Sequence, residues 1–593
     1  MKYKKVVIAI ISILVMIGCM SLSKEANVKY ICASMIYGES GIDNREIIFS
    51  KESGFYNHPF ELRLYAPTEE IYYTLDGSEP DYTSIKYKDS IFVKDASENP
   101  NVYSSSMEVT ARFLEDEVME NCGEEQKKIS YVVPKQPVDK CNVIKAVYYD
   151  KDGKKSKVEE MIYFVGFQEK TGYEGVNIIS ITTNPENLFD YEKGIYVLGK
   201  KYDEYSEGGI PKEDWKREYW NHWNANYKQR GIEWERQSHI QVFDDNGRWV
   251  LSQDTGIRIQ GGGSRGFLPK SLNIYARDEY GNNQLNYDFF GTGYYPKRVT
   301  LSNGGDDYYT KIKDCLVSQL SEECNFTTMN YVPYHLFLNG EYWGFYYLTE
   351  KYDAQYIEHY YGVDKGKVVD DIIIIKNNLL ETGIEEDKEG FYAEMQACIL
   401  EKDLSIKENY ENVCEVIDIS SFIDYFAVEG YIARSEDWPN QNFALWRSRN
   451  ISNKKYEDGK WRWMLFDVNS SSMSYELISH DIIATLRSTS DLFDSLCENS
   501  EFKKLFSSRL IELSETVFEK EYVNQKIDEY VQLMNQPIEK HYQRFFGTSN
   551  QKYYDGIQEI RTFFNQRKSY VFESIRTNFG EEYLGENLSE QLF

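Results

Sequence analysis

The stretches SEDWPNQNFALWRSR, residues 435–449, and KWRWMLFDVN, residues 460–469, decide the kind of fold that this sequence predicts. Asn442 follows Asp437 by five residues, and Asp467 stands at the end of an apolar run typical of a strand. An ionised carboxylate can accept the proton of a hydroxyl group, and Asp and Asn oxygens are ligands that Mg²⁺ and Mn²⁺ prefer. Phosphoryl-transfer enzymes use this spacing. By itself the five-residue spacing is also found in capped loops, so the surrounding chain has to decide.

A glycine-rich block precedes these stretches. GIRIQGGGSRGFLPKSLNIYAR, residues 256–277, predicts a strand, a flexible turn and a second strand. The candidates for nucleotide binding in this block are Gly262, Gly263, Ser264, Arg265 and Lys270. Adjacent backbone N–H groups in such a turn can cradle phosphate oxygens, an arginine can clamp a phosphate with two bonds, and a lysine can bridge phosphates as a compact charge. The alternative is a plain glycine-rich hairpin.

Between the glycine-rich block and the acidic stretches the sequence predicts a helix and a hairpin. The helix, residues 308–323, stands where a kinase places the acid that pairs its phosphate-binding lysine. The acids that could do so are Asp314, Glu322 and Glu323, and the spacing does not choose among them. The hairpin, residues 331–353, leads to Glu350. We expect Glu350 to hold the ribose or base of a nucleotide; the alternatives are an ion pair with Lys351 and a cap of the helix starting near Asp353.

Helices are predicted on both sides of the two acidic stretches. One helix, residues 418–434 with Ser420 as its N-cap, delivers the chain to Asp437. After Ser470 the apolar residues recur at helical spacing as far as the C-terminal region. These later helices carry no catalytic signal and would pack the second lobe of the domain.

Four blocks resemble the CotH kinase family, which is named for spore-coat proteins, and they occur in the family's order. The blocks are residues 256–281, GEYWGFYYLTEKYD at 340–353, SEDWPNQNFALW at 435–446 and WRWMLFDVN at 461–469. The resemblance implies an α+β kinase-like domain over residues 175–580 that uses ATP with Mg²⁺ or Mn²⁺ to phosphorylate a protein. It implies Asp437 as the catalytic base and Asp467 and Asn442 as metal ligands. Asn469 stands where the family commonly shows a second Asp.

The region from residue 47 to residue 167 predicts a smaller unit of short strands. EIYYTLDGSEPDYTSIKYKDSIFVK, residues 70–94, alternates apolar and polar residues about a turn at Asp76-Gly77. Several short strands with regular turns predict a β-sandwich. The run YTLDGSEP, residues 73–80, resembles the chitobiase C-terminal-like sandwich repeat, whose members usually act as spacers or adhesive domains. Asp76 and Glu79 are therefore read as turn residues.

The N-terminus predicts export. Three lysines precede an apolar run too short for an ordinary membrane-spanning helix, which is typical of a signal peptide over residues 1–19. MIGC resembles a bacterial lipobox, so Cys19 either carries a lipid anchor or lies near a simple cleavage site. Residues 20–46 would then form a linker. We expect the protein at the cell surface or anchored to the membrane.

The amino-acid composition argues against two kinds of binding partner, nucleic acid and zinc. A formal net charge of -29 argues against nucleic acid, which needs clustered Lys and Arg. No cysteine pair or histidine set has zinc-ligand spacing. The sequence thus predicts a multidomain protein: an N-terminal all-β sandwich and an α+β kinase-like domain with a helical C-terminal portion. We expect an exported protein kinase whose acceptor is a coat or surface protein, or the kinase itself. The alternative is a non-catalytic scaffold, or a protein that binds cell-wall polysaccharide, on a degenerate kinase fold.

Overall fold

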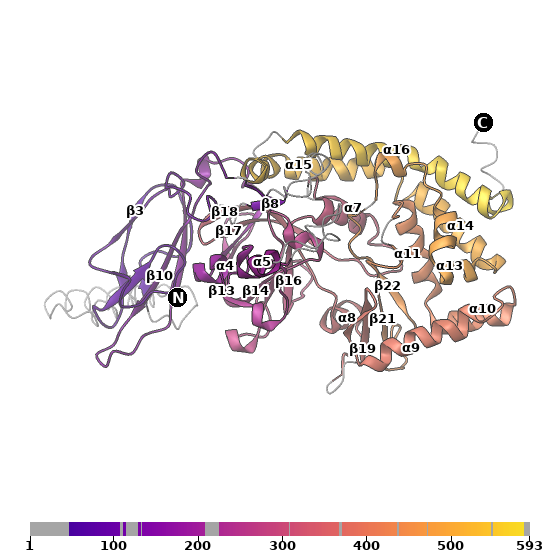
Figure 1. Ribbon diagram of the computed structural model, residues 1–593, viewed down its shortest axis with the longest axis horizontal. Helices are drawn as coiled ribbons and strands as arrows, with labels where there is room; N and C mark the ends of the chain where they lie inside the picture. The colour runs from indigo at the N-terminus through magenta and orange to yellow at the C-terminus, as the bar shows by residue number, and fades with distance from the viewer. Residues whose placement is uncertain are drawn as a thin grey trace, which may run out of the picture. The chain divides into compact units, whose positions relative to one another are not determined.

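The computed structural model describes residues 47–106, 111–113, 129–131, 133–207, 224–307, 309–366, 371–435, 438–470, 472–546 and 550–585. The chain forms two compact units. The first unit comprises Met1–Tyr287, Pro333–Tyr346 and Gln536–Thr548; the second comprises Asp288–Val332, Tyr347–Asn535 and Ser549–Phe593. Strands dominate the indigo and magenta part of the chain in Figure 1, and helices its orange and yellow part. The predicted fold class, with a β-rich N-terminal region and a helical C-terminal portion, is confirmed.

Short paired strands build the N-terminal part of the first unit. A five-stranded sheet has the order β2 (Gly54–Tyr56), β11 (Glu159–Val165), β10 (Asn142–Tyr148), β5 (Ile71–Thr74) and β6 (Ile85–Lys86). Three two-stranded sheets pair β1 (Ile48–Phe49) with β4 (Leu64–Tyr65), β3 (Phe60–Leu62) with β7 (Ile91–Val93), and β8 (Ala111–Phe113) with β9 (Ile129–Tyr131). Every pair in these sheets is antiparallel except β11 with β2.

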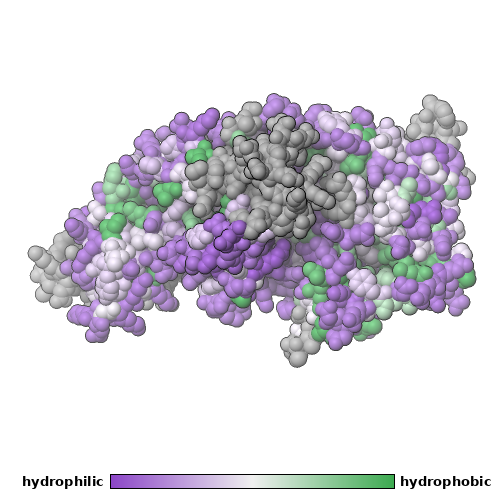
Figure 2. All heavy atoms as spheres, viewed as in Figure 1, coloured by the Kyte–Doolittle hydropathy of each residue, from purple (hydrophilic) through white to green (hydrophobic). Residues whose placement is uncertain are grey.

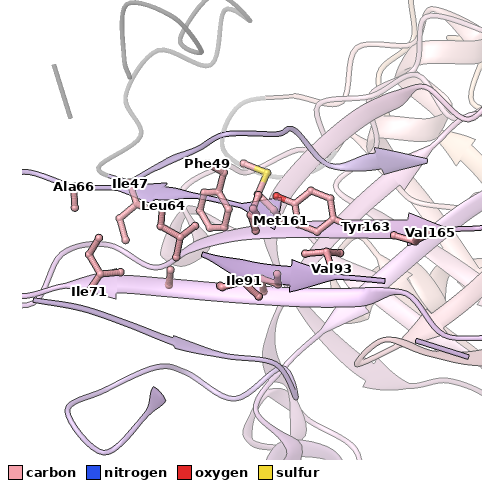
Figure 3. Packing of buried hydrophobic residues seen from close by; sticks show 13 residues of the cluster. Ile47, Phe49, Leu64, Ala66, Ile71, Ile91, Val93, Met161, Tyr163 and Val165 are labelled. Carbon is pink, nitrogen blue, oxygen red and sulfur yellow. The ribbon is translucent and has the colours of Figure 1, made fainter. Parts of the chain in front are cut away.

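The core of this region lies between the sheets. Figure 3 shows Phe49 of β1, Leu64 of β4, and Met161 and Tyr163 of β11 directed toward one another. Because alternate residues of a strand face the same side, the period-2 pattern of the sequence delivers these side chains to one interior. The hydroxyl of the buried Tyr163 donates to the carbonyl of Lys51 at 2.9 Å, so its polar end is satisfied.

The predicted turn at Asp76-Gly77 lies within a longer connection. Strand β5 ends at Thr74 and β6 begins at Ile85, so the two strands form a hairpin with a ten-residue loop. Asp76 Oδ1 accepts from the backbone N–H of Ser78 at 3.0 Å, and Gly77 has a φ of 83°. The geometry of an Asx turn therefore accounts for the Asp-Gly pair without a ligand.

A second, larger sheet completes the first unit. In the first unit its order is β17 (Tyr331–Leu338), β12 (Asn177–Thr182), β13 (Arg236–Phe243), β14 (Trp249–Ile259) and β15 (Leu272–Tyr275). Strand β12 runs parallel to β17 and antiparallel to β13. Phe164 of the sandwich packs against Phe243 and Phe337 of this sheet, with ring centroids 5.3 and 5.1 Å away. The sandwich and the sheet therefore share one apolar cluster.

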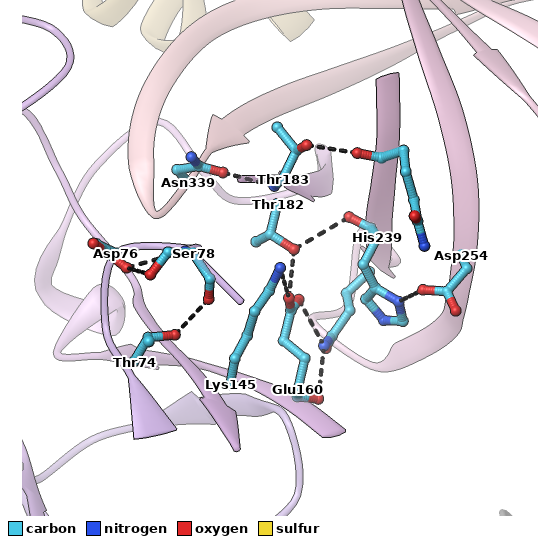
Figure 4. A network of polar contacts seen from close by, with 12 residues as sticks. Thr74, Asp76, Ser78, Lys145, Glu160, Thr182, Thr183, His239, Asp254 and Asn339 are labelled. Atoms are coloured by element: carbon cyan, nitrogen blue, oxygen red, sulfur yellow. Dashed lines mark hydrogen bonds and ion pairs between the residues drawn. The ribbon is translucent and has the colours of Figure 1, made fainter. Parts of the chain in front are cut away.

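A buried polar network crosses the same junction (Figure 4). Lys145 Nζ lies 3.4 Å from Glu160 Oε2, and both side chains are buried. The hydroxyl of Thr182 donates to the Glu160 carboxylate, and Gln241 Nε2 donates to the Glu160 carbonyl at 3.1 Å. Removing either member of the ion pair would leave an uncompensated buried charge, so the network fixes how sandwich and sheet are matched.

The second unit contains a four-stranded antiparallel sheet and most of the helices. The sheet order is β20 (Leu379–Thr382), β19 (Ile372–Lys376), β21 (Ala444–Ser448) and β22 (Arg462–Met464); β16 (Arg298–Ser302) pairs with the end of β18 (Glu341–Thr349). The helices are α7 (Lys313–Leu320), α8 (Ala354–Tyr361), α9 (Glu385–Met395), α10 (Lys407–Val416), α11 (Ile419–Tyr431), α12 (Ile482–Thr489), α13 (Asp491–Leu496), α14 (Ser500–Glu515), α15 (Lys520–Phe545, whose last turns belong to the first unit) and α16 (Gln551–Asn578).

Helix α11 is the centre of the second unit. Its rings at Phe422 and Phe426 stack at 4.1 Å, and Phe422 meets Trp463 of β22 edge-on at 4.9 Å. The predicted N-cap at Ser420 is wrong, because Asp418 accepts from the backbone N–H of Ser421 at 3.1 Å. Within the described ranges, no helix combines the length and apolar character needed to cross a membrane. Figure 2 shows mainly hydrophilic side chains on the face that it presents.

Candidate functional site

The glycine-rich segment, residues 260–271, joins β14 to β15 in the first unit. The two strands are antiparallel with Ile257 opposite Ile274, so the strand, turn and strand that the sequence predicts are present. Gly261 has a φ of 114°, and a Cβ there would lie 2.3 Å from Ser264 Oγ. Only glycine fits that position. Gly262, by contrast, has open space where a Cβ would lie.

Arg265 and Lys270 donate to backbone oxygens around this segment. Arg265 Nε donates to the carbonyl of Gly261 at 2.8 Å, and its Nη1 donates to those of Tyr227 and Gln229 at 3.1 and 2.9 Å. Lys270 Nζ donates to the carbonyl of Arg265 at 2.8 Å. Both side chains are buried, and no carboxylate of the described residues bonds either one. The two cations therefore fix the shape of the turn.

Two further cations surround the same turn. Lys228 Nζ donates to the carbonyls of Gly262 and Gly263 at 3.3 and 3.4 Å, and Arg230 donates to that of Gly261 at 3.0 Å. Burial, with the charges of Arg265 and Arg230, lowers the pKa of Lys228 to about 8. Lys228, Arg230 and Arg265 therefore place three cationic side chains around one turn, where positive charge favours an anion.

In the second unit, Asp467 lies three residues beyond the end of β22. It has a φ of 57°, a left-handed conformation that is uncommon for Asp. Its Oδ1 accepts from Asn469 Nδ2 at 3.0 Å, and its backbone carbonyl accepts from Arg434 Nη1 at 2.7 Å. Arg434 lies 3.7 Å from Glu429, and both side chains are fully buried. A buried ion pair thus supports the backbone at Asp467.

Asp314, on α7, holds the residues that follow Asp467. Its carboxylate accepts from the backbone N–H of Val468 at 2.8 Å and from Asn469 Nδ2 at 2.6 Å. Burial and the charge of Asp467 raise the pKa of Asp314 to about 7. The amide of Asn469 therefore separates two carboxylates that would otherwise repel each other. Of the three acids proposed for the helix, Glu322 and Glu323 are exposed beyond its end.

The register of three strands brings further residues to the same end of the sheet. Ala444 of β21 lies between Lys376 of β19 and Met464 of β22. Asn442, two residues before Ala444, and Asp467, three residues after Met464, therefore extend from the same end as Lys376. Asn442 also has a positive φ, 51°. The sheet thus brings together both predicted metal ligands and a lysine.

Lys351 and Lys376 are the functional candidates that the sequence did not single out. Burial lowers the pKa of Lys376 to about 8, opposed by Glu381 and Asp467, and lowers that of Lys351 well below its ordinary value. Lys376 Nζ lies 3.4 Å from the Phe466 ring centroid. Neither ammonium group has a hydrogen bond to a carboxylate of the described chain. The only signal in the sequence was a lysine ending the buried run of β19.

Glu350 has local partners. It is buried, accepts from the backbone N–H and the side chain of Asn330 at 2.8 and 3.1 Å, and accepts from the hydroxyl of Tyr360. Burial raises its pKa to about 7, against these hydrogen bonds. The cap of α8 is Asp353, which accepts from the backbone N–H of Tyr356 at 2.9 Å. Glu350 is therefore neither the cap nor hydrogen-bonded to Lys351.

The side-chain oxygens at this end of the sheet suit a hard metal cation. The side chains of Asp467 and Asn442 carry oxygens of the kind that a hard cation prefers, and Asp467 Oδ2 accepts no hydrogen bond from the described residues. Mg²⁺ is commonly held by one or two such side chains together with substrate phosphates. Where the structure describes the chain, no cluster of three His, Cys, Asp or Glu residues could hold a metal by itself. Asp437 and Cys19 lie outside the described residues.

The class of protein follows from three features: two strands joined by a glycine-rich turn, a helical C-terminal portion, and carboxylate and amide oxygens near lysines. Together these features are those of a kinase-like protein. The family model described as CotH kinase protein matches residues 257–571, more than half of the chain. This protein belongs to the CotH kinase family. A second model, described as Fn3 associated, matches residues 53–163. No curated protein matches the chain.

Proposed function

We propose that this protein is an atypical protein kinase that transfers the γ-phosphate of ATP to a protein hydroxyl group. The observation that carries the proposal is the convergence of Lys376, Asn442 and Asp467 at one end of a sheet. The lysines supply positive charge without a carboxylate bonded to it, and the two oxygen donors suit Mg²⁺ or Mn²⁺. Phosphoryl transfer needs both features, because charge develops on the phosphate oxygens.

Each residue then has a definite part. Lys351 and Lys376 bind phosphate oxygens, and the negative charge of the phosphates raises their lowered pKa values again. Asp467 and Asn442 hold the metal, which neutralises phosphate charge when bound. Asp437, five residues before Asn442, accepts the proton of the acceptor hydroxyl.

The glycine-rich segment serves the nucleotide through its backbone. Gly262, Gly263 and Ser264 offer the turn, and Arg265 and Lys270 hold its shape by bonding its carbonyls. Glu350 lies at the end of β18 and keeps that end folded through Asn330 and Tyr360. We propose that the glycine-rich turn binds nucleotide by its shape and by the local positive charge.

The setting of the activity follows from the N-terminal sequence. A signal peptide, with or without lipid on Cys19, would place the protein at the cell surface or on the membrane. The acceptor would then be a surface or coat protein, or the kinase itself. Nucleic acid is an unsuitable partner for a chain with a net charge of -29.

The test is transfer of label from γ-labelled ATP by the purified protein with Mg²⁺ or Mn²⁺. Asp437→Ala and Asp467→Ala should each reduce self-labelling and labelling of added surface proteins by about a thousandfold or more. Glu415→Ala is the matched control, because Glu415 is an exposed acid on α10 of the same unit. Its labelling should equal that of the unchanged protein.

Nucleotide binding, measured separately by calorimetry, distinguishes the scaffold alternative. A protein that binds no nucleotide with either metal and transfers no label would be a non-catalytic scaffold. Binding without transfer in the unchanged protein would reject the kinase and leave only a nucleotide-binding function.

A further inference from the structure

We infer that the N-terminal sandwich carries a carbohydrate-binding platform centred on Tyr82. The Tyr82 ring stacks on the Tyr149 ring with centroids 3.6 Å apart and planes 19° apart. Tyr72 meets both rings edge-on, with centroids 5.8 Å away. Tyr149 is buried, whereas Tyr82 is 56% exposed. The stack therefore presents one flat aromatic ring to solvent.

The exposed ring is held rigidly. Asp81, the residue before it, accepts from the backbone N–H and the hydroxyl of Thr83 at 2.7 and 2.6 Å, which closes a local turn. At the other end of the ring, the Tyr82 hydroxyl donates to the carbonyl of Gly153 at 3.2 Å. A ring fixed at both ends loses little conformational freedom when a ligand binds.

Charged groups surround the three tyrosines. Glu70 bonds the Tyr72 hydroxyl at 3.0 Å and pairs with Lys86 at 2.7 Å, and Lys155 lies 3.9 Å from Glu79. Asp81 adjoins Tyr82 in sequence. Acceptors and donors of both charges therefore lie near the exposed ring.

The rigid exposed ring and the charged groups near it together indicate which class of ligand would bind. A protein partner normally buries several apolar anchors at the centre of an interface and keeps charged groups at its rim, whereas here charged side chains lie close to the tyrosine stack itself. A pyranose has the area of one aromatic ring, an apolar face of C–H groups and a rim of hydroxyls. Its face can pack on Tyr82 while its hydroxyls bond the surrounding carboxylates and lysines. Sugars with equatorial substituents, as in β-linked polysaccharides, expose such a face best.

The experiment is co-sedimentation of the full chain with insoluble β-linked polymers, chitin and purified peptidoglycan, and with α-linked starch. We expect retention by at least one β-linked polymer and none by starch. Tyr82→Ala should weaken retention by about threefold to tenfold, the range of one aromatic contact. Tyr82→Trp should preserve it, because the indole ring restores a flat face.

Phe92→Ala is the matched control. Phe92 is 61% exposed on β7 of the same sandwich and has no stacked neighbour among the described residues, so its loss should leave retention unchanged. Chitin and peptidoglycan as separate arms identify the source of the sugar. Retention by neither, or equal retention by the Tyr82→Ala protein with an unchanged thermal melt, would overturn the inference. The outcome is independent of the kinase assay, because none of these residues lies in the proposed phosphoryl-transfer site.

Discussion

The glycine-rich turn of the first unit and the sheet end of the second unit both concentrate lysine and arginine, but they use these cations differently. Arg265 and Lys270 bond the carbonyls of their own turn. Lys351 and Lys376 bond no carboxylate of the described chain and lie within the electrostatic influence of Asp467. The difference shows that a basic side chain beside a motif can serve the fold, while one that no motif marks can serve a ligand.

The largest effect is expected from removing Arg265, which tests whether this side chain stabilises the turn or binds phosphate. Arg265→Met would leave the carbonyls of Tyr227 and Gln229 without their donor, while the carbonyl of Gly261 would keep only Arg230. We expect the free energy of unfolding to fall by about 3 kcal/mol, since each buried unsatisfied group costs about 1–3 kcal/mol and the lost charge burial offsets part. Urea unfolding measures the loss. A variant with unchanged stability and abolished nucleotide binding would show that Arg265 contacts phosphate directly.

Removing Lys376 should lower the affinity for nucleotide without lowering the stability of the protein. Lys376→Met eliminates a cation that has no carboxylate bonded to it, so stability should stay the same or rise slightly. Nucleotide affinity should fall about tenfold to a hundredfold, as expected for a lost charge-assisted bond of about 1.5–3 kcal/mol. Calorimetric titration with ATP and Mg²⁺ checks this. Lys455→Met is the control, because Lys455 is exposed in the same unit and, among the described residues, bonds only Tyr456.

Replacing Asn469 tests whether an amide is needed between the two carboxylates at the sheet end. Asn469→Asp would place a third carboxylate against those of Asp314 and Asp467, where the amide now donates to both. In buffer without divalent metal we expect the free energy of unfolding to fall by about 1–2 kcal/mol, because two favourable bonds become repulsive contacts. Adding Mg²⁺ should recover part of the loss. Thermal melts with and without Mg²⁺ measure it, and a variant as stable as the unchanged protein would remove the need for an amide there.

The sequence predicted those features that local patterns determine. Asp467 at a strand end, the glycine-rich turn and the helical portion follow from short-range periodicity. Lys376 could not be found this way, because its position depends on pairing with Ala444, far along the chain. The cap of α11 was misplaced by two residues, since Asp418 and Ser420 are both good caps and only the backbone of the helix start decides.

The pH dependence of stability tests the charge around the glycine-rich turn. The pKa of Lys228 is lowered to about 8 in the folded protein, whereas it is about 10.4 in an unfolded chain. Below pH 8 both states hold the proton, so Lys228 adds no pH dependence. Between pH 8 and about pH 10.4, Lys228 holds its proton in the unfolded state but not in the folded state. The free energy of unfolding therefore rises with pH by up to about 1.4 kcal/mol per pH unit. Lys228→Met should remove this rise.

The measurement is urea unfolding of both proteins at intervals from pH 7 to pH 10, and the quantity compared is the difference in their free energies of unfolding. The variant should be the more stable protein near pH 7, and its advantage should shrink as the pH rises. Lys200→Met is the control, because Lys200 is an exposed lysine of the same unit that pairs with Glu192. A constant difference across the range would mean that Lys228 keeps its ordinary pKa in the folded protein.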